Sequence, residues 1–345
     1  MSDPLTFAFT LRALEIHLTF ATLVALAAWA VTSSPPFVTA TKCSRRVVSA
    51  TKRSRRVVSA TTKYWIWVAT SLNFLLPAGV FVDRLRPPNL AWVLPLEDFG
   101  SRISRDRTVG MALAAVWVIG AALMLARLAW RIRADRGRLR LPPATQSRSG
   151  LFARGVPVRF DAEGAAPAVD GLFRPRISLP AGIEHLLTPP ELDAVLIHEL
   201  THARRRDNLI RLAHEIGVCV FWFHPMVWVA GSRLSLYREL SCDESVIRRA
   251  RGGDLVSALA KLTNPAETLL LQSGASSFLA DRVASLAVPR RISPAASTLQ
   301  AVLFGLLLLA SILGSAFQAN LMRRASLGEF CPRLRAELAA ATPAK

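Results

Sequence analysis

Four long apolar stretches constrain the fold of this chain more than any other feature of its sequence. They cover residues 7–31, 64–82, 109–130 and 299–317. A run of roughly 20 apolar residues matches the hydrocarbon thickness of a bilayer. Inside a bilayer a helix satisfies all of its own backbone hydrogen bonds, so we expect four transmembrane helices. The composition, 52% hydrophobic and 19% charged, also argues against a purely cytosolic globule.

The distribution of Lys and Arg predicts how these helices are oriented. Residues 33–63 carry eight Lys or Arg, and residues 131–154 carry seven. Basic loops stay in the cytoplasm, so we place the 33–63 loop and the long 131–298 segment there. The N-terminus, the second loop and the tail 318–345 then face outward, as in a multi-pass membrane protein. A cleaved signal peptide ending at Ala28-Trp29-Ala30 is disfavoured, because no basic residues precede the first apolar run.

The positive charge of the chain suggests a membrane surface as its anionic partner. The formal net charge is +19. Its basic clusters adjoin apolar runs and lack interleaved aromatic residues, so we expect contact with the lipid bilayer and no direct nucleic acid binding. Residues 41–50 and 51–60 form a tandem repeat whose arginines are either lipid-binding or simply solvated. The four cysteines show no CxxC spacing, which excludes a cysteine-based zinc site.

The 131–298 segment is expected to be a separate α+β domain between the three-span region 1–130 and the fourth helix 299–317. An Arg-rich linker is followed by short strand candidates, which predict a small antiparallel sheet. They are Val156–Phe160, Ala168–Leu172 and Arg176–Leu179. A helix should then begin after Thr188, because Thr188, Pro189 and Glu191 form a capping-box pattern.

That helix carries the sequence His198-Glu199-Leu200-Thr201-His202. Residues four apart lie on one helical face, so both imidazoles can bind a single Zn²⁺ ion. Glu199 lies one step around the helix, where it can act as the catalytic general base on a water molecule. The HExxH spacing therefore predicts a zinc hydrolase site.

A second helical pattern at 225–251 supplies further acidic groups. Glu239 and Asp243 are four residues apart and share a face, so Glu239 can be the third metal ligand. Asp243 can then accept a hydrogen bond from a ligating imidazole. Tyr237 and His224 are weaker candidates for stabilising an oxyanion, and either can equally be a packing or capping residue. Cys242 is interpreted as buried packing.

These motifs resemble the BlaR/MecR-type antirepressor membrane metallopeptidases. The resemblance rests on HELTH followed by RRRDNL, on FWFHPMVW at 221–228, on RELSCDESV at 238–246 and on PRISLP at 175–180. It implies a gluzincin-like fold, zinc ligands His198, His202 and Glu239, and Glu199 as general base. His224 departs from the asparagine that is usual in the family. About 28 residues follow the fourth stretch, so no C-terminal penicillin-binding sensor domain is expected.

The expected function is therefore a membrane zinc endopeptidase that acts in signal transduction. Its substrate would be a cytoplasmic protein, such as a winged-helix repressor, or the chain itself, with Arg290-Arg291 as a candidate cleavage point. One alternative is a membrane quality-control or CAAX-type protease, which shares both motifs. Another is a non-catalytic transducer with a structural metal, although such a site has no need of Glu199.

Overall fold

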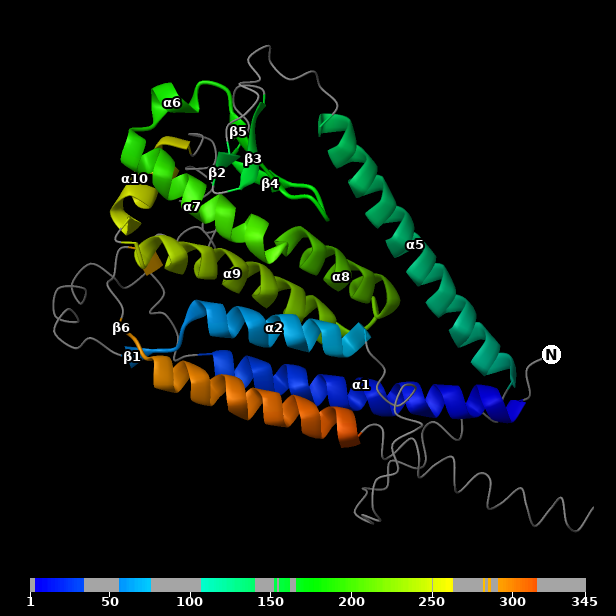
Figure 1. Cartoon of the computed structure of the whole chain (residues 1–345). Helices are drawn as coiled ribbons and strands as arrows, with labels where there is room; N and C mark the ends of the chain where they lie inside the picture. Colours follow the sequence, from blue (N-terminus) through cyan, green and yellow to red (C-terminus); the bar gives the residue numbers. More distant parts are fainter. Residues whose placement is uncertain are drawn as a thin grey trace, which may run out of the picture.

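The computed structural model describes residues 4–33, 56–75, 107–139, 152–153, 155–161, 166–249, 251–262, 282, 285–286 and 291–314. In these ranges the chain is mostly helical, with a small sheet at one end (Figure 1). The elements are α1 (Pro4–Thr32), β1 (Arg56–Val57), α2 (Ala60–Leu75), α5 (Arg107–Leu139), β2 (Phe152–Ala153), β3 (Val156–Asp161), β4 (Ala168–Asp170), β5 (Arg176–Pro180), α6 (Ile183–Leu186), α7 (Pro189–Arg205), α8 (Asp207–Val220), α9 (Pro225–Ile247), α10 (Gly252–Leu262) and β6 (Arg291–Ile292). A further helix covers Pro294–Gly314.

Two helices are long and apolar enough to cross a membrane, judged by length and composition. They are Met111–Ala134, within α5, and Pro294–Gly314, which correspond to the third and fourth expected spans. The first expected span is helical, but its apolar stretch His17–Thr32 is shorter than a full crossing. Part of the second expected span, residues 76–82, lies outside the described residues. The four-span layout therefore stays a prediction.

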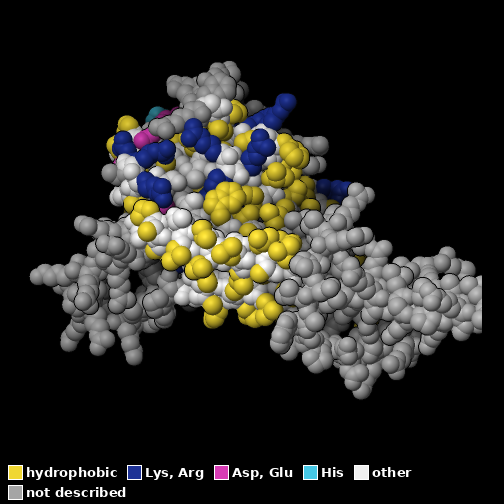
Figure 2. Space-filling model, turned by 60° about the horizontal axis from the view of Figure 1, so that its bottom comes forward, with side chains coloured by type: hydrophobic (Ala, Val, Ile, Leu, Met, Phe, Trp, Pro, Cys, Tyr) yellow, Lys and Arg dark blue, Asp and Glu magenta, His cyan; other side chains and the backbone are white. Residues whose placement is uncertain are grey.

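The apolar helices leave a broad hydrophobic face on the molecule. Large apolar side chains are exposed along α1, α5 and Pro294–Gly314. Figure 2 shows hydrophobic side chains gathered on the face that bears α1 and Pro294–Gly314 in Figure 1, with Lys and Arg side chains gathered above them. Such a large apolar surface beside a basic one suits a bilayer and its headgroup layer.

Helix α2 differs from a lipid-facing span, because it is packed between α1 and α9. Tyr64, Trp67 and Phe74 are fully buried there. Lys63 donates a hydrogen bond to the carbonyl oxygen of Thr32 over 2.9 Å. Buried polar side chains of this kind need protein partners, which the neighbouring helices supply. Helix α2 thus belongs to the same packed unit as α9.

The strands lie where the sequence predicted them, but the sheet is mixed and the expected antiparallel arrangement is wrong. The strand order is β2-β3-β5-β4. Strands β4 and β5 pair antiparallel as a hairpin, whereas β3 and β5 pair in parallel. Strand β5 lies between β3 and β4, so β3 does not form a hairpin with the next strand in the sequence and instead pairs in parallel with β5. The buried face of β5 packs on α7 through Ile177 and Leu179.

Helix α7 begins as predicted, and its start is fixed by contacts to α10. Thr188 is the N-cap, and its backbone N–H donates to Glu191 Oε2 over 2.8 Å. The carboxylate of Glu191 also accepts hydrogen bonds from Ser257 and from Lys261, the latter over 2.7 Å. The apolar side of α7 packs through Val195 and neighbouring residues into the core formed with β5 and α10.

A sharp reversal separates α7 from α8. Arg206 adopts a left-handed backbone conformation, with φ of 55°, and α8 begins at the next residue, Asp207. This single non-helical residue lets the chain turn while keeping Asp207 close to the end of α7. Helix α9 then returns alongside both helices and ends at Ile247, four residues before the predicted end at 251.

Candidate metal centre

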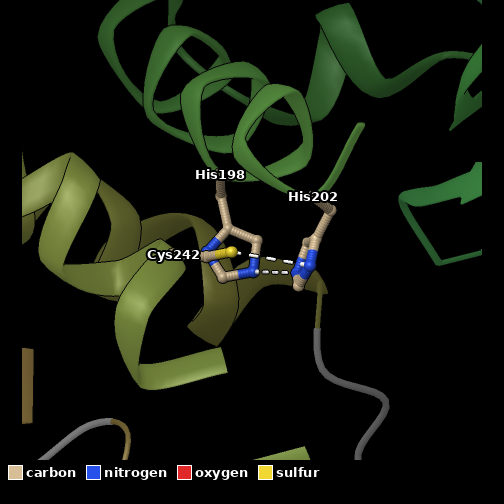
Figure 3. A group of neighbouring side chains, drawn as sticks. All are labelled: His198, His202 and Cys242. Atoms are coloured by element: carbon tan, nitrogen blue, oxygen red, sulfur yellow. Dashed lines mark hydrogen bonds between the residues drawn. The ribbon is translucent and has the colours of Figure 1, made fainter. Parts of the chain in front are cut away.

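The two histidines of α7 lie side by side and face α9 (Figure 3). One helical turn separates them, and their Nε2 atoms are 3.2 Å apart. His198 is buried, with 5% of its surface exposed. The HExxH spacing thus brings two imidazole nitrogens together, as predicted.

Glu239 of α9 completes a group of three donors. Its Oε2 lies 3.4 Å from His198 Nε2, and its Oε1 lies 3.7 Å from His202 Nε2. Bonds of about 2.0–2.2 Å in a tetrahedral zinc site imply separations of roughly 3.3–3.5 Å between ligand atoms. The three side chains therefore lie at separations compatible with a zinc ion, with a different oxygen of Glu239 facing each histidine.

A separate carboxylate supports each imidazole from behind. Asp243, fully buried, has its Oδ1 3.0 Å from His198 Nδ1. Asp207 has its Oδ2 2.7 Å from His202 Nδ1. Such contacts fix the tautomer and orientation of a ligating ring, leaving Nε2 free for the metal. Asp243 was predicted in this role, whereas the sequence suggested for Asp207 only that it ties down the end of the helix, and its contact with His202 was not predicted. The sequence signal available was that two ligating imidazoles need two supporting groups, of which Asp243 supplies only one.

Asp207 is itself held by two further side chains. Tyr64 of α2 donates its hydroxyl to Oδ1 over 2.7 Å, and Arg205 donates to Oδ2 over 2.6 Å. Helix α2, far away in the sequence, therefore contributes to the support of His202. No local motif at Tyr64 could have indicated this contact.

Arg282 is a second residue that the sequence reading missed. Its guanidinium donates to both oxygens of Asp243, over 2.9 and 3.0 Å. It also lies 3.5 Å from His198 Nε2 and 3.5 Å from Glu239 Oε2. An isolated arginine outside any motif carries no sequence signal, so only the tertiary structure reveals it.

The carboxylates make the centre strongly favourable for positive charge. Burial lowers the pKa of His198, but the hydrogen bonds that its ring donates to the carboxylates of Asp243 and Glu239 outweigh burial and raise that pKa to about 9. Burial raises the pKa of Glu239, yet its contacts with both histidines hold it well below its usual range. A site that stabilises imidazolium cations in this way also attracts a divalent cation.

Cys242 is the other donor close to the two histidines (Figure 3). Its Sγ lies 3.5 Å from His202 Nδ1, the nitrogen that Asp207 already engages. Arg205 also donates a hydrogen bond to this sulfur over 3.0 Å. The sulfur thus adjoins the back of the His202 ring, whereas Glu239 adjoins the Nε2 atoms. Glu239 and Cys242 are therefore both candidates for the third ligand, and Glu239 is the one that adjoins the Nε2 atoms.

Glu199 is buried beside His198 on α7. Its charge is among those that raise the pKa of Arg282, which places the carboxylate in the electrostatic environment of the centre. This position is consistent with the predicted role of a general base. Glu199 itself stays a predicted catalytic residue.

The two oxyanion candidates have other partners in the structure. Tyr237 donates its hydroxyl to the carbonyl oxygen of Thr32 over 3.0 Å, inside the core shared by α1, α2 and α9. His224 caps α9, where its Nδ1 accepts the N–H of Met226, and its Nε2 lies 2.9 Å from Thr22 Oγ1. Both side chains thus have the capping or packing roles that the sequence left open.

Comparisons with known proteins find a matching family and distant relatives. Residues 46–254 match the family described as BlaR1 peptidase M56. The regulatory protein BlaR1 of Bacillus licheniformis is 26% identical over 246 residues, covering 65% of this chain and 40% of that protein. The methicillin resistance mecR1 protein of Staphylococcus aureus strain Mu50 is 22% identical over 103 residues, covering 30% of this chain and 18% of that protein. The chain thus spans less than half the length of the curated relatives it matches.

Proposed function

Because the chain belongs to the BlaR1 peptidase M56 family, we propose that it is a membrane-bound zinc endopeptidase. The observation that carries the proposal is the placement of His198, His202 and Glu239. Their donor atoms are separated by 3.2 to 3.7 Å, although Glu239 comes from a different helix. Two candidate membrane helices in the same chain support attachment to a bilayer.

His198, His202 and Glu239 would hold the ion, and Asp243 and Asp207 would orient the two imidazoles. Three protein ligands are typical of a catalytic zinc site, which keeps one position open. A Zn²⁺ ion held in this way supplies Lewis-acid polarisation of a peptide carbonyl and acidifies a water molecule.

Glu199 would perform the proton transfers. As a carboxylate on the same helix as His198 and His202, it would accept a proton from the attacking water and later deliver it to the leaving amine. Its burial on α7 supports this role, because a carboxylate held by a rigid helix is positioned before the substrate binds.

The substrate would be a protein at the inner face of the membrane, such as a repressor, or the chain itself. Names of the relatives, a regulatory protein and a methicillin resistance protein, favour a role in signal transduction. Of the candidate cleavage point Arg290-Arg291, Arg291 lies in β6, which pairs in parallel with β1. Arg290 lies outside the described residues.

The test compares the full-length wild type in detergent with Glu199→Gln and with the control Glu184→Gln, an exposed residue of α6. Zinc content is measured together with cleavage of a proteome-derived peptide library, read by mass spectrometry. We expect all three proteins to bind zinc and only Glu199→Gln to lose cleavage, by at least about 100-fold.

Two outcomes would contradict the proposal. Cleavage that survives in Glu199→Gln would remove the assigned base. A zinc-loaded wild type that cleaves no peptide in the library would favour a transducer with a structural metal.

A further inference from the structure

A cavity of about 330 Å³ lies between α5, α8 and α9, outside the group of metal ligands. Its α5 wall consists of Met124, Arg127, Leu128 and Arg131. These positions are three or four residues apart, so they share one helical face. They occupy the last turns of the candidate span Met111–Ala134, where a membrane helix meets the headgroup layer.

The walls of the cavity carry an excess of positive charge. Four arginines and two carboxylates line it: Arg127, Arg131, Arg211, Arg238, Glu215 and Asp207. Glu215 lies 3.4 Å from Arg131 and 4.0 Å from Arg211, so a single carboxylate is shared by two guanidinium groups and neutralises only one of the two positive charges. Asp207 is already engaged by His202 and Arg205. Arg127 has no ion-pair partner among the residues that the structure describes, so an anion can bind it without displacing one.

A buried histidine with an unpaired ring nitrogen also lines the cavity. His214 is 8% exposed, and within the described part of the chain its Nδ1 has no hydrogen-bond partner. Its Nε2 side packs on Gly231, where an added Cβ would lie only 2.4 Å away. Leaving a buried polar nitrogen without a partner is costly, so one residue that lines the cavity carries an unused hydrogen-bonding atom.

We propose that this cavity binds the phosphate headgroup of an anionic phospholipid. Arg127 and Arg131 would bind the phosphate, since guanidinium groups pair readily with phosphate oxygens. The apolar wall, which includes Leu128 and Trp228, would contact the acyl chains. A soluble phosphate ligand would not explain why this charged cavity opens at the end of a membrane helix.

The same cavity contacts the support of the metal centre. Arg238 lines it, and its guanidinium donates to Glu239 Oε1 over 2.9 and 3.1 Å. Asp207 also lines it and holds His202 Nδ1. A bound headgroup that attracts Arg238 would change the environment of the third ligand. Lipid binding is thus positioned to regulate the centre.

The experiment uses native mass spectrometry of the full chain in detergent, with added phosphatidylglycerol or phosphatidylcholine. Wild type is compared with Arg127→Gln and with the matched control Arg133→Gln. Arg133 is exposed on the same helix, six residues after Arg127, and does not line the cavity. We expect wild type and the control to retain phosphatidylglycerol preferentially, and Arg127→Gln to retain about fivefold less.

Three results would overturn the proposal, and the third comes from a competition arm that identifies the source of the phosphate. Equal retention of both lipids, or an equal loss in the two variants, would show general attraction to a basic surface. Displacement of the lipid by an equal concentration of glycerol phosphate would show that the cavity takes soluble phosphate, against the assignment. Because lipid retention is measured without peptide cleavage, the lipid-binding result could be interpreted even if the proposed peptidase activity were not found.

Discussion

The guanidinium of Arg282 and the carboxylate of Asp243 form a two-pronged ion pair directly behind His198. Nη2 donates to Oδ1 over 2.9 Å and Nε donates to Oδ2 over 3.0 Å. Asp243 is fully buried, and it also lies 3.0 Å from His198 Nδ1. The arginine therefore neutralises a carboxylate that would otherwise be an unpaired charge buried away from solvent. Its guanidinium also lies 3.5 Å from two of the proposed ligands, His198 and Glu239.

Replacing Arg282 should destabilise the metal-free protein more than the zinc-loaded protein. Breaking a buried ion pair leaves an uncompensated charge, which costs on the order of 3 kcal/mol. A bound cation at the same carboxylate cluster offsets part of that cost. Arg282→Gln should therefore lower the Tm strongly in chelator and weakly in zinc. The control is Arg248→Gln, whose side chain is 60% exposed and pairs with Glu244. If Arg282→Gln lowered the Tm equally with and without zinc, the argument would be contradicted.

Asp207→Asn should weaken zinc binding about 10- to 100-fold, because the amide no longer fixes the His202 tautomer as the carboxylate does. Competition with a coloured chelator measures the affinity in the full chain. The matched control is Asp193→Asn on the exposed side of α7, which pairs only at the surface with Arg251. An unchanged affinity in Asp207→Asn would show that the 2.7 Å contact to His202 plays no part in metal binding.

Glu239→Gln and Cys242→Ala distinguish the two candidates for the third ligand. Glu239 adjoins the Nε2 atoms of both histidines, whereas Cys242 adjoins His202 Nδ1. Glu239→Gln should lose most of its zinc, while Cys242→Ala should keep about one ion per chain. Elemental analysis of the purified proteins measures both. The reverse pattern would assign the third position to the cysteine.

The capping carboxylate of Glu191 should make stability depend on pH in a defined window. Hydrogen bonds from Lys261 first, and then from Ser257 and Thr188, lower its pKa from 4.5 to about 2. A carboxylate with a lowered folded-state pKa stabilises the protein above the unfolded-state value, and this contribution is lost as pH falls from about 4.5 towards 2.

Glu191→Gln should therefore reduce stability at neutral pH, and its difference from wild type should shrink at about pH 3. Denaturant unfolding at each pH, followed by circular dichroism, measures the difference. Glu184→Gln, at an exposed position in α6, should show no such dependence. A difference that stays constant as the pH falls would mean that the charge of Glu191 is not what stabilises α7.

Local sequence patterns predicted those features that are set by residues close together in the chain, such as helix starts, helix faces and strand positions. The capping box at Thr188 fixed the start of α7, and four-residue spacing placed His198 and His202 on one face. The ExxxD pattern brought Glu239 and Asp243 to the same centre, because a helix aligns residues four apart wherever it packs. Strand positions were also predicted, since apolar runs between Gly and Pro mark them locally.

The tertiary structure alone decided which distant groups complete the centre. Asp207 reaches His202 because Arg206 reverses the chain, and Tyr64 reaches Asp207 because α2 packs against α8 as well as α9. Arg282 reaches Asp243 from a segment with no recognisable motif. The parallel pairing of β3 with β5 likewise depends on which edge β4 leaves free. Periodicity reports only what a residue shares with its own helix or strand, whereas these contacts depend on how separate elements pack.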